Sequence, residues 1–244
     1  MIATSIAAVR SLITYVVILL YIAVVGPIGL TAAVLFGATN LLFALGHGGI
    51  WLALTLAGIR SRVSGREYLP KSPAVYCANH QSNVDPPVLF EVLHPRMRIL
   101  YKAELHKFPL MGPILDAGGF VPVDRANREQ AFAALDRGAG SIRNGNSFLI
   151  FPEGTRSRDG SLLPFKKGGF VMAINAQVPI VPVAVSGGRD SMRKGSPIVR
   201  PARVTVRIGE PIPTAGLTLD DKEHLIARVR AEVEKLLDAG PLWT

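Results

Sequence analysis

The sequence predicts an α/β fold in which a mostly parallel or mixed sheet is covered by helices and preceded by an N-terminal apolar helical hairpin. Three observations support this prediction. Residues 11–59 contain no Asp, Glu, Lys or Arg, short apolar runs separated by turn signals recur after residue 60, and segments with helical periodicity lie between several of these runs. We therefore expect a membrane-inserted helical segment over residues 1–60 and an α/β domain over residues 61–244.

The apolar segment is too long for a single membrane crossing. As one continuous helix, residues 11–59 would extend about 74 Å, whereas the hydrocarbon core of a bilayer is about 30 Å thick. Glycine and proline offer three possible breaks, at Gly26-Pro27, at residues 37–40 and at residues 46–49, and each is a candidate for the hairpin turn. We expect two or three apolar helices, over residues 11–25, 28–36 or beyond, and 41–59.

Membrane insertion is favoured over two other interpretations. A secretory signal peptide has an apolar run of about 7 to 15 residues, which is much shorter than this one. A hairpin buried in a soluble core would need apolar surface on all sides, which the rest of the sequence does not offer. The flanking residues Arg10, Arg60, Arg62 and Arg66 place both ends of the segment, and with them the α/β domain, on the cytoplasmic side of the cell membrane by the positive-inside rule. An even number of crossings or a re-entrant hairpin would satisfy this rule.

Six short apolar runs are predicted to form the strands of the sheet. The run at residues 180–185 is almost continuously apolar, which suits a strand covered on both faces. Helical periodicity predicts one helix over residues 129–142 and another near the C-terminus, where Thr218 and Asp221 have the spacing of a capping box. The predicted strands lie at residues 74–78, 97–101, 120–123, 147–151, 180–185 and 204–208.

The α/β domain is basic, which limits the partners to consider. All but one of the 27 Lys and Arg residues and all 18 Asp and Glu residues lie from residue 60 onward, so this part has a net charge of +8. Such a surface suits anionic lipid, a phosphate-bearing ligand or nucleic acid. Nucleic acid is disfavoured because the chain has no zinc-ligand spacing, helix-turn-helix pattern or aromatic-rich RNA-binding strand. The lone cysteine, Cys77, excludes an internal disulfide and is expected to be a core residue.

Residues 79–85, with the sequence NHQSNVD, contain a histidine and a carboxylate five positions apart. An imidazole can act as a base through one ring nitrogen when the other has a partner, and Asp85 can be that partner of His80 if the segment turns. Pro86 and Pro87 should end the preceding strand and hold Asp85 in a non-helical conformation, which permits such a turn. A capped turn without catalytic function is the alternative.

A second polar motif, FPEGTRS at residues 151–157, supplies a carboxylate and a guanidinium. It directly follows the predicted strand at 147–151, just as the first motif follows the strand at 74–78. Both motifs are therefore expected on loops at the ends of strands, where open α/β sheets usually bind their ligands.

The two motifs together resemble the glycerolipid acyltransferase family, whose best-known members are the 1-acyl-sn-glycerol-3-phosphate acyltransferases. Residues 119–125, GFVPVDR, look like the family's second block, which ends in an arginine, although a Phe-Ile pair is more usual than Val-Pro-Val. Residues 180–185, IVPVAV, look like its fourth block. The resemblance extends in order over residues 65–210 and identifies residues 61–244 as the acyltransferase domain.

This resemblance implies a direct role for His80 as general base on the acceptor hydroxyl, with Asp85 fixing its tautomer and stabilising the imidazolium. Ser82 is expected to cap the turn, because no Gly-x-Ser-x-Gly elbow surrounds it. One histidine and one aspartate do not make a metal site, and none is expected.

The remaining motif residues are assigned to the substrate. Glu153 is expected either to hold the glycerol hydroxyls or to pair with the arginine of its own motif, and the pair at residues 166–167 either lies at the mouth of the site or is a solvated face. Gly154 permits close approach of the backbone. The expected substrate-binding residues are Glu153, Gly154, Thr155 and, as phosphate ligands, Arg156, Arg125 and Lys102.

The resemblance implies transfer of a fatty acyl group from a thioester to the sn-2 hydroxyl of 1-acylglycerol 3-phosphate, which gives phosphatidic acid. Acyl-CoA and acyl carrier protein are both candidate donors, and no cofactor is expected. The alternatives are an acyltransferase for another lysophospholipid or a glycolipid, and a membrane protein that only binds anionic lipid.

Overall fold

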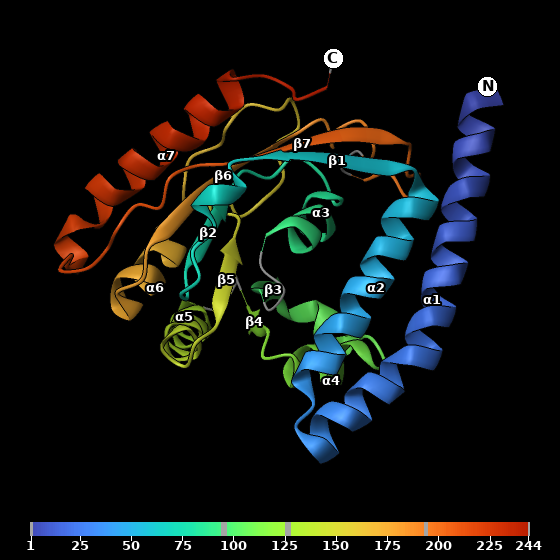
Figure 1. Cartoon of the computed structure of the whole chain (residues 1–244), viewed down its shortest axis with the longest axis horizontal. Helices are drawn as coiled ribbons and strands as arrows, with labels where there is room; N and C mark the ends of the chain where they lie inside the picture. The colour runs from blue at the N-terminus through green and yellow to red at the C-terminus, as the bar shows by residue number, and fades with distance from the viewer. Residues whose placement is uncertain (1, 94–96, 125–127, 193–194, 244) are drawn as a thin grey trace.

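The computed structural model describes residues 2–93, 97–124, 128–192 and 195–243, and its centre is a mixed sheet of seven strands in the order β1-β7-β6-β2-β5-β3-β4 (Figure 1). Neighbouring strands run parallel except β6 and β7, which are antiparallel. The predicted fold class is therefore confirmed. The strands are β1 Ile59–Ser64, β2 Val75–Ala78, β3 Met97–Lys102, β4 Val121–Val123, β5 Ser147–Ile150, β6 Ile180–Ser186 and β7 Ala202–Ile208.

All six predicted strands form, each within two residues of its expected bounds. The seventh, β1, was not predicted, because it is an edge strand that pairs only with β7 and whose residues 60–62 are exposed. The third apolar helix was expected to include Ile59. It ends earlier because Gly58 adopts a left-handed conformation (φ 73°) that closes the helix and starts the strand.

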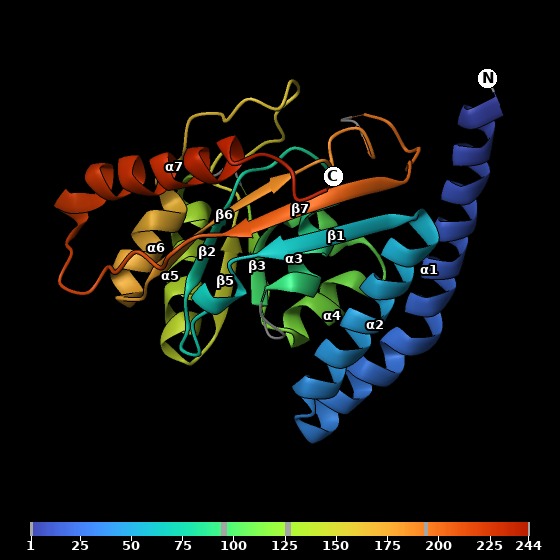
Figure 2. The same ribbon diagram turned by 45° about the horizontal axis from the view of Figure 1, so that its top comes forward.

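Helices cover both faces of the sheet. Figures 1 and 2 show α5, α6 and α7 gathered on one face, and α3 with the N-terminal hairpin on the other. The predicted helix at 129–142 is α5, and the capping box of Thr218 and Asp221 is present, at the start of a 3-10 turn that leads into α7. The α-helices that follow the hairpin are α3 Asp85–Val92, α4 Met111–Ala117, α5 Arg128–Arg143, α6 Gly168–Ala176 and α7 Lys222–Asp238. The 3-10 helices are η1 Arg66–Tyr68, η2 Ala103–Lys107 and η3 Leu219–Asp221.

The N-terminal segment forms two helices, α1 Ile2–Phe36 and α2 Thr39–Ala57, joined at Gly37 and Ala38. Gly37 has φ 65°, and the Ala38 N–H bonds to the carbonyl of Ala32 in the manner of a glycine-closed helix end. The break expected at Gly26-Pro27 is wrong, because α1 continues through Pro27, and α2 likewise continues through residues 46–49.

The glycines at the two rejected breaks allow close contact between helices. A Cβ at Gly26 would lie 3.0 Å from the Ile114 side chain of α4, and a Cβ at Gly49 would lie 2.9 Å from the ring of Tyr21. The Tyr21 hydroxyl in turn donates a hydrogen bond of 2.8 Å to the carbonyl of Leu45. Small residues at such positions let helices approach closely, as in membrane helix pairs.

The hairpin packs against the α/β domain along its length. Near the start of α1, the Ser11 hydroxyl bonds to both the N–H and the carbonyl of Val199, and the Tyr15 hydroxyl donates to the carbonyl of Pro197. In α2, Phe43 stacks on Phe90 of α3. By length and composition both helices could cross a membrane, and few of their residues are buried in the protein.

Candidate active site

His80 and Asp85 lie in contact at the end of β2. The Nδ1 atom of His80 is 2.9 Å from the Oδ2 atom of Asp85, and the ring stacks on Phe151 with its centroid 4.2 Å away. Because a carboxylate only accepts, a neutral imidazole here carries its proton on Nδ1 and leaves Nε2 free to take a proton. The His80 side chain is 16% exposed, so the ring is partly accessible.

The carboxylate of Asp85 is buried and held by the backbone of its own loop. Its Oδ2 atom also accepts the N–H groups of Gln81 at 2.6 Å and Ser82 at 2.7 Å. The expectation that Asp85 is non-helical is wrong, because it is the first residue of α3. Pro86 and Pro87 lie in the first turn, where backbone N–H groups have no acceptor within the helix, so the N–H that proline lacks is not missed.

Asn79 anchors the start of this loop, a function that the sequence did not reveal. Its side-chain amide donates to the carbonyl of Val185 at 2.9 Å, and its Oδ1 accepts the Val185 N–H at 2.7 Å. These two bonds extend the pairing of β2 and β6 by one residue beyond Ala78. The loop therefore leaves the sheet from a fixed point.

Glu153 connects the two motifs through bonds to the backbone. It is 3% exposed, and its carboxylate accepts the backbone N–H of His80 at 2.7 Å and of Leu163 at 3.0 Å. Burial raises the pKa of Glu153, whereas the N–H groups of His80 and Leu163 act to lower it. With both oxygens bound to backbone, Glu153 holds the loop that begins at His80 rather than pairing with Arg156.

Two further contacts fix the segment after Glu153. The backbone N–H of Ser157 donates to the carbonyl of His80 at 2.8 Å. From α7, Arg230 donates to the carbonyls of Leu162 and Leu163. A sequence pattern could not identify Arg230, because it lies about 70 residues from the loop that it binds.

Arg156 immediately precedes Ser157, whose backbone N–H bonds to the carbonyl of His80. Its Nη1 atom is buried and has no acceptor among the residues that the structure describes. A buried guanidinium nitrogen without an acceptor is costly unless a ligand supplies one, so this atom suits an anionic substrate group. In the same motif Gly154 has φ 67°, and the Lys166 side chain lies over it. Thr155 is exposed.

The other expected phosphate ligands are less well placed or outside the described residues. Lys102 ends β3, two strands from β2 at the same edge of the sheet, but it is 62% exposed and pairs with Glu104 at 3.0 Å. Arg125 lies outside the described residues. The lone Cys77 is a fully buried core residue, as predicted, and burial raises its pKa.

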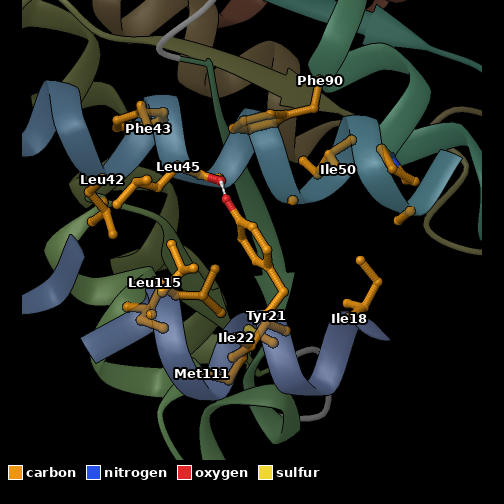
Figure 3. Close-up of a pocket in the computed structure, with 18 of the residues that line it drawn as sticks. Ile18, Tyr21, Ile22, Leu42, Phe43, Leu45, Ile50, Phe90, Met111 and Leu115 are labelled. Carbon is orange, nitrogen blue, oxygen red and sulfur yellow. Dashed lines mark hydrogen bonds between the residues drawn. The ribbon is translucent and has the colours of Figure 1, made fainter. Parts of the chain in front are cut away.

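An apolar cavity of about 540 Å³ adjoins the start of α3. Figure 3 shows side chains from α1, α2, α3 and α4 pointing into it, with Tyr21 standing between the two hairpin helices. Pro86 and Pro87, which follow Asp85, form part of its wall. This volume and this apolar lining suit a hydrocarbon chain.

Comparisons with known proteins give consistent matches. A family model described as Acyltransferase matches residues 60–186. The 1-acyl-sn-glycerol-3-phosphate acyltransferase alpha of Homo sapiens is 38% identical over 177 residues, which cover 72% of this chain and 62% of the human protein. The 1-acyl-sn-glycerol-3-phosphate acyltransferase of Saccharomyces cerevisiae is 34% identical over 189 residues, covering 76% of this chain and 62% of the yeast protein.

A solved structure is similar over almost the whole chain. The crystal structure of the 1-acyl-sn-glycerophosphate acyltransferase from Thermotoga maritima matches with a TM-score of 0.84 at 27% identity and covers 97% of each chain. The chain spans about three fifths of the length of the curated relatives that it matches.

Replacing Glu153 with Gln tests its bracing role. The amide NH₂ would face one of the two backbone N–H groups, which then loses its acceptor at a cost of about 1 to 3 kcal/mol. We expect Glu153→Gln to lower the denaturant midpoint of the detergent-solubilised protein and to lower kcat more than it raises KM. The exposed Glu210→Gln should change neither. If the two variants behave alike, Glu153 does not brace the loop.

Proposed function

The chain belongs to the acyltransferase family, and from this premise we propose that it transfers a fatty acyl group from a thioester donor to the sn-2 hydroxyl of 1-acylglycerol 3-phosphate, giving phosphatidic acid. The observation that carries the proposal is the partly accessible His80 ring, whose Nδ1 is bound to a buried carboxylate and whose Nε2 is left free. Relatives named for this reaction support it.

The proposed chemistry requires a base, a positioned acceptor and a place for the acyl chain. His80 Nε2 takes the proton of the acceptor hydroxyl as its oxygen attacks the thioester carbonyl. The C–S bond then breaks, and the thiolate leaves with the proton from the imidazolium. Asp85 stabilises the positive charge that His80 acquires between these two transfers.

Arg156 is proposed to hold the phosphate of the acceptor. A phosphate monoester carries nearly two negative charges at pH 7, and its oxygens are the acceptors that the buried Nη1 atom lacks. Arginine's planar fork binds two such oxygens at once. Lys166, which lies over Gly154, adds positive charge to the same loop. Arg125 and Lys102 remain proposed ligands from the family resemblance.

The apolar cavity is proposed to take the acyl chain that is transferred. It lies between the hairpin and α3, whose first residue is Asp85, so a chain bound there leads toward the histidine. The thioester donor, acyl-CoA or acyl carrier protein, would reach the site from the aqueous side.

The N-terminal segment, residues 1–60, is proposed to insert into the cell membrane, with the acyltransferase domain on the cytoplasmic side. Two observations support insertion. The hairpin exposes large apolar side chains along both helices, and few residues of either helix are buried in the protein. A surface of this kind is stable in lipid and unfavourable in water.

Substitution of His80 tests the catalytic proposal. We expect His80→Ala to lower phosphatidic acid formation from a labelled acyl donor by at least about 10², because a positioned base contributes that much. Asp85→Asn should cost nearly as much. The exposed His224→Ala is the control. A His80 variant that keeps more than about a tenth of the rate would contradict the mechanism.

Substitution of Arg156 tests the acceptor. Loss of a charge-assisted contact costs roughly 1.5 to 3 kcal/mol, so Arg156→Ala should weaken use of 1-acylglycerol 3-phosphate about 10- to 10²-fold. Arg156→Lys should also be impaired, because it keeps the charge but loses the fork. The measurement is transfer from one labelled donor to a panel of lysolipids. Equal effects on acceptors whose phosphate carries a head group would indicate another lysophospholipid as the substrate.

Gly46 offers a test of the acyl cavity. It lines the cavity, and apart from the adjoining backbone of its own helix no described atom lies within 4 Å of the position that its Cβ would occupy. Gly46→Leu should therefore fill part of the cavity, favour the helix and shift products toward shorter acyl chains. Gly46→Ala should shift them much less. The readout is the acyl composition of the product from a mixture of donors, and an unchanged composition would exclude this cavity as the acyl site.

A further inference from the structure

A short segment outside the hairpin exposes an unusual amount of apolar surface. Among the described residues after α2, five large apolar side chains are exposed, and three of them lie within six consecutive residues. These are Leu105 at 43%, Phe108 at 60% and Leu110 at 37% exposure. The segment is the end of η2 and the turn into α4, and we refer to residues 105–110 as the η2 tip.

Polar contacts between His106 of the η2 tip and the rest of the domain hold the tip in this orientation. His106 Nδ1 is 3.1 Å from the hydroxyl of the buried Tyr101, and its Nε2 is 3.7 Å from Asp116 of α4. Gly112 makes room for this histidine, since a Cβ there would lie 2.8 Å from the His106 carbonyl oxygen. The histidine is thus bound to the protein, while the three large apolar side chains remain outside.

The η2 tip is joined to the hairpin through α4. It leads directly into α4, which packs on α1 where Ile114 meets Gly26 (Figure 1). The end of α1, which lies beside Pro113 and Ala117 of α4, exposes Val34 at 66%, Leu35 at 68% and Phe36 at 79%. The exposed Lys107 lies among the apolar residues of the tip, and a basic side chain beside an aromatic one is typical of the boundary between lipid and water.

We propose that the η2 tip is a second membrane contact, which inserts Leu105, Phe108 and Leu110 into the same bilayer that holds the hairpin. This proposal rests on membrane insertion of the hairpin, as proposed above. This contact fixes the orientation of the α/β domain on the membrane. The end of the sheet formed by β3 and β4 then faces the bilayer, on the same side as the apolar cavity that α4 lines.

Site-directed spin labelling of the full chain in vesicles of phosphatidylcholine and phosphatidylglycerol tests the contact. Cys77 is fully buried and needs no replacement, so single cysteines can be labelled elsewhere. The matched pair is Leu105→Cys and Leu219→Cys, since both leucines lie in 3-10 helices with 43% and 45% exposure, and the helix of Leu105 packs on α4 whereas that of Leu219 packs on α7. Phe108→Cys and, in the hairpin, Val24→Cys complete the set.

We expect the labels at 105 and 108 to be several-fold more accessible to oxygen, relative to a water-soluble nickel chelate, than the label at 219. Equal accessibility at 105, 108 and 219, with the label at 24 in lipid, would overturn the tip contact and leave the hairpin proposal intact. If the label at 24 is also in water, membrane insertion itself fails. Labels at 105 and 108 shielded from both reagents would indicate a protein contact, which also overturns the proposal.

Discussion

The buried carboxylate of Asp85 is the constraint on which the candidate site depends. A carboxylate without partners in the interior is strongly destabilised, and here one oxygen accepts three N–H groups, those of Gln81, Ser82 and the His80 ring. Satisfying that oxygen requires the chain to turn tightly between β2 and α3. The same turn sets the orientation of the imidazole, the start of α3 and the position of Pro86 in the cavity wall.

The parallel pairing of β2 and β5 brings the second motif to this turn. Because the two strands are neighbours in the same direction, the segments that follow them emerge side by side. Glu153 and Ser157 then join the segments through bonds to the backbone of His80. A side chain that binds backbone fixes a loop whatever residues that loop carries. The ends of β2 and β5 therefore position the site, together with the contacts between its side chains.

Sequence reasoning succeeded where a local pattern determines the structure. Apolar runs located six of seven strands, and the five-residue spacing correctly placed Asp85 at His80. It failed where distant packing decides. Pro27 did not end α1, because Gly26 and its neighbours pack closely on other helices, and Arg230 gave no local signal of its contact with the 162–163 backbone. The roles of Glu153 also depended on which backbone donors the fold places opposite it.

The hairpin completes the apolar cavity beside the turn that holds His80 and Asp85. One wall comes from the α/β domain, with Pro86, Phe90 and Phe120, and the other from the hairpin, with residues such as Ile18 and Leu45. Removing the hairpin would leave the first wall open to water. The proposed acyl transfer needs an apolar site for the chain close to a polar site for the base. The docking of α2 on α3 provides both, because Asp85 begins the helix whose next residues border the apolar cavity.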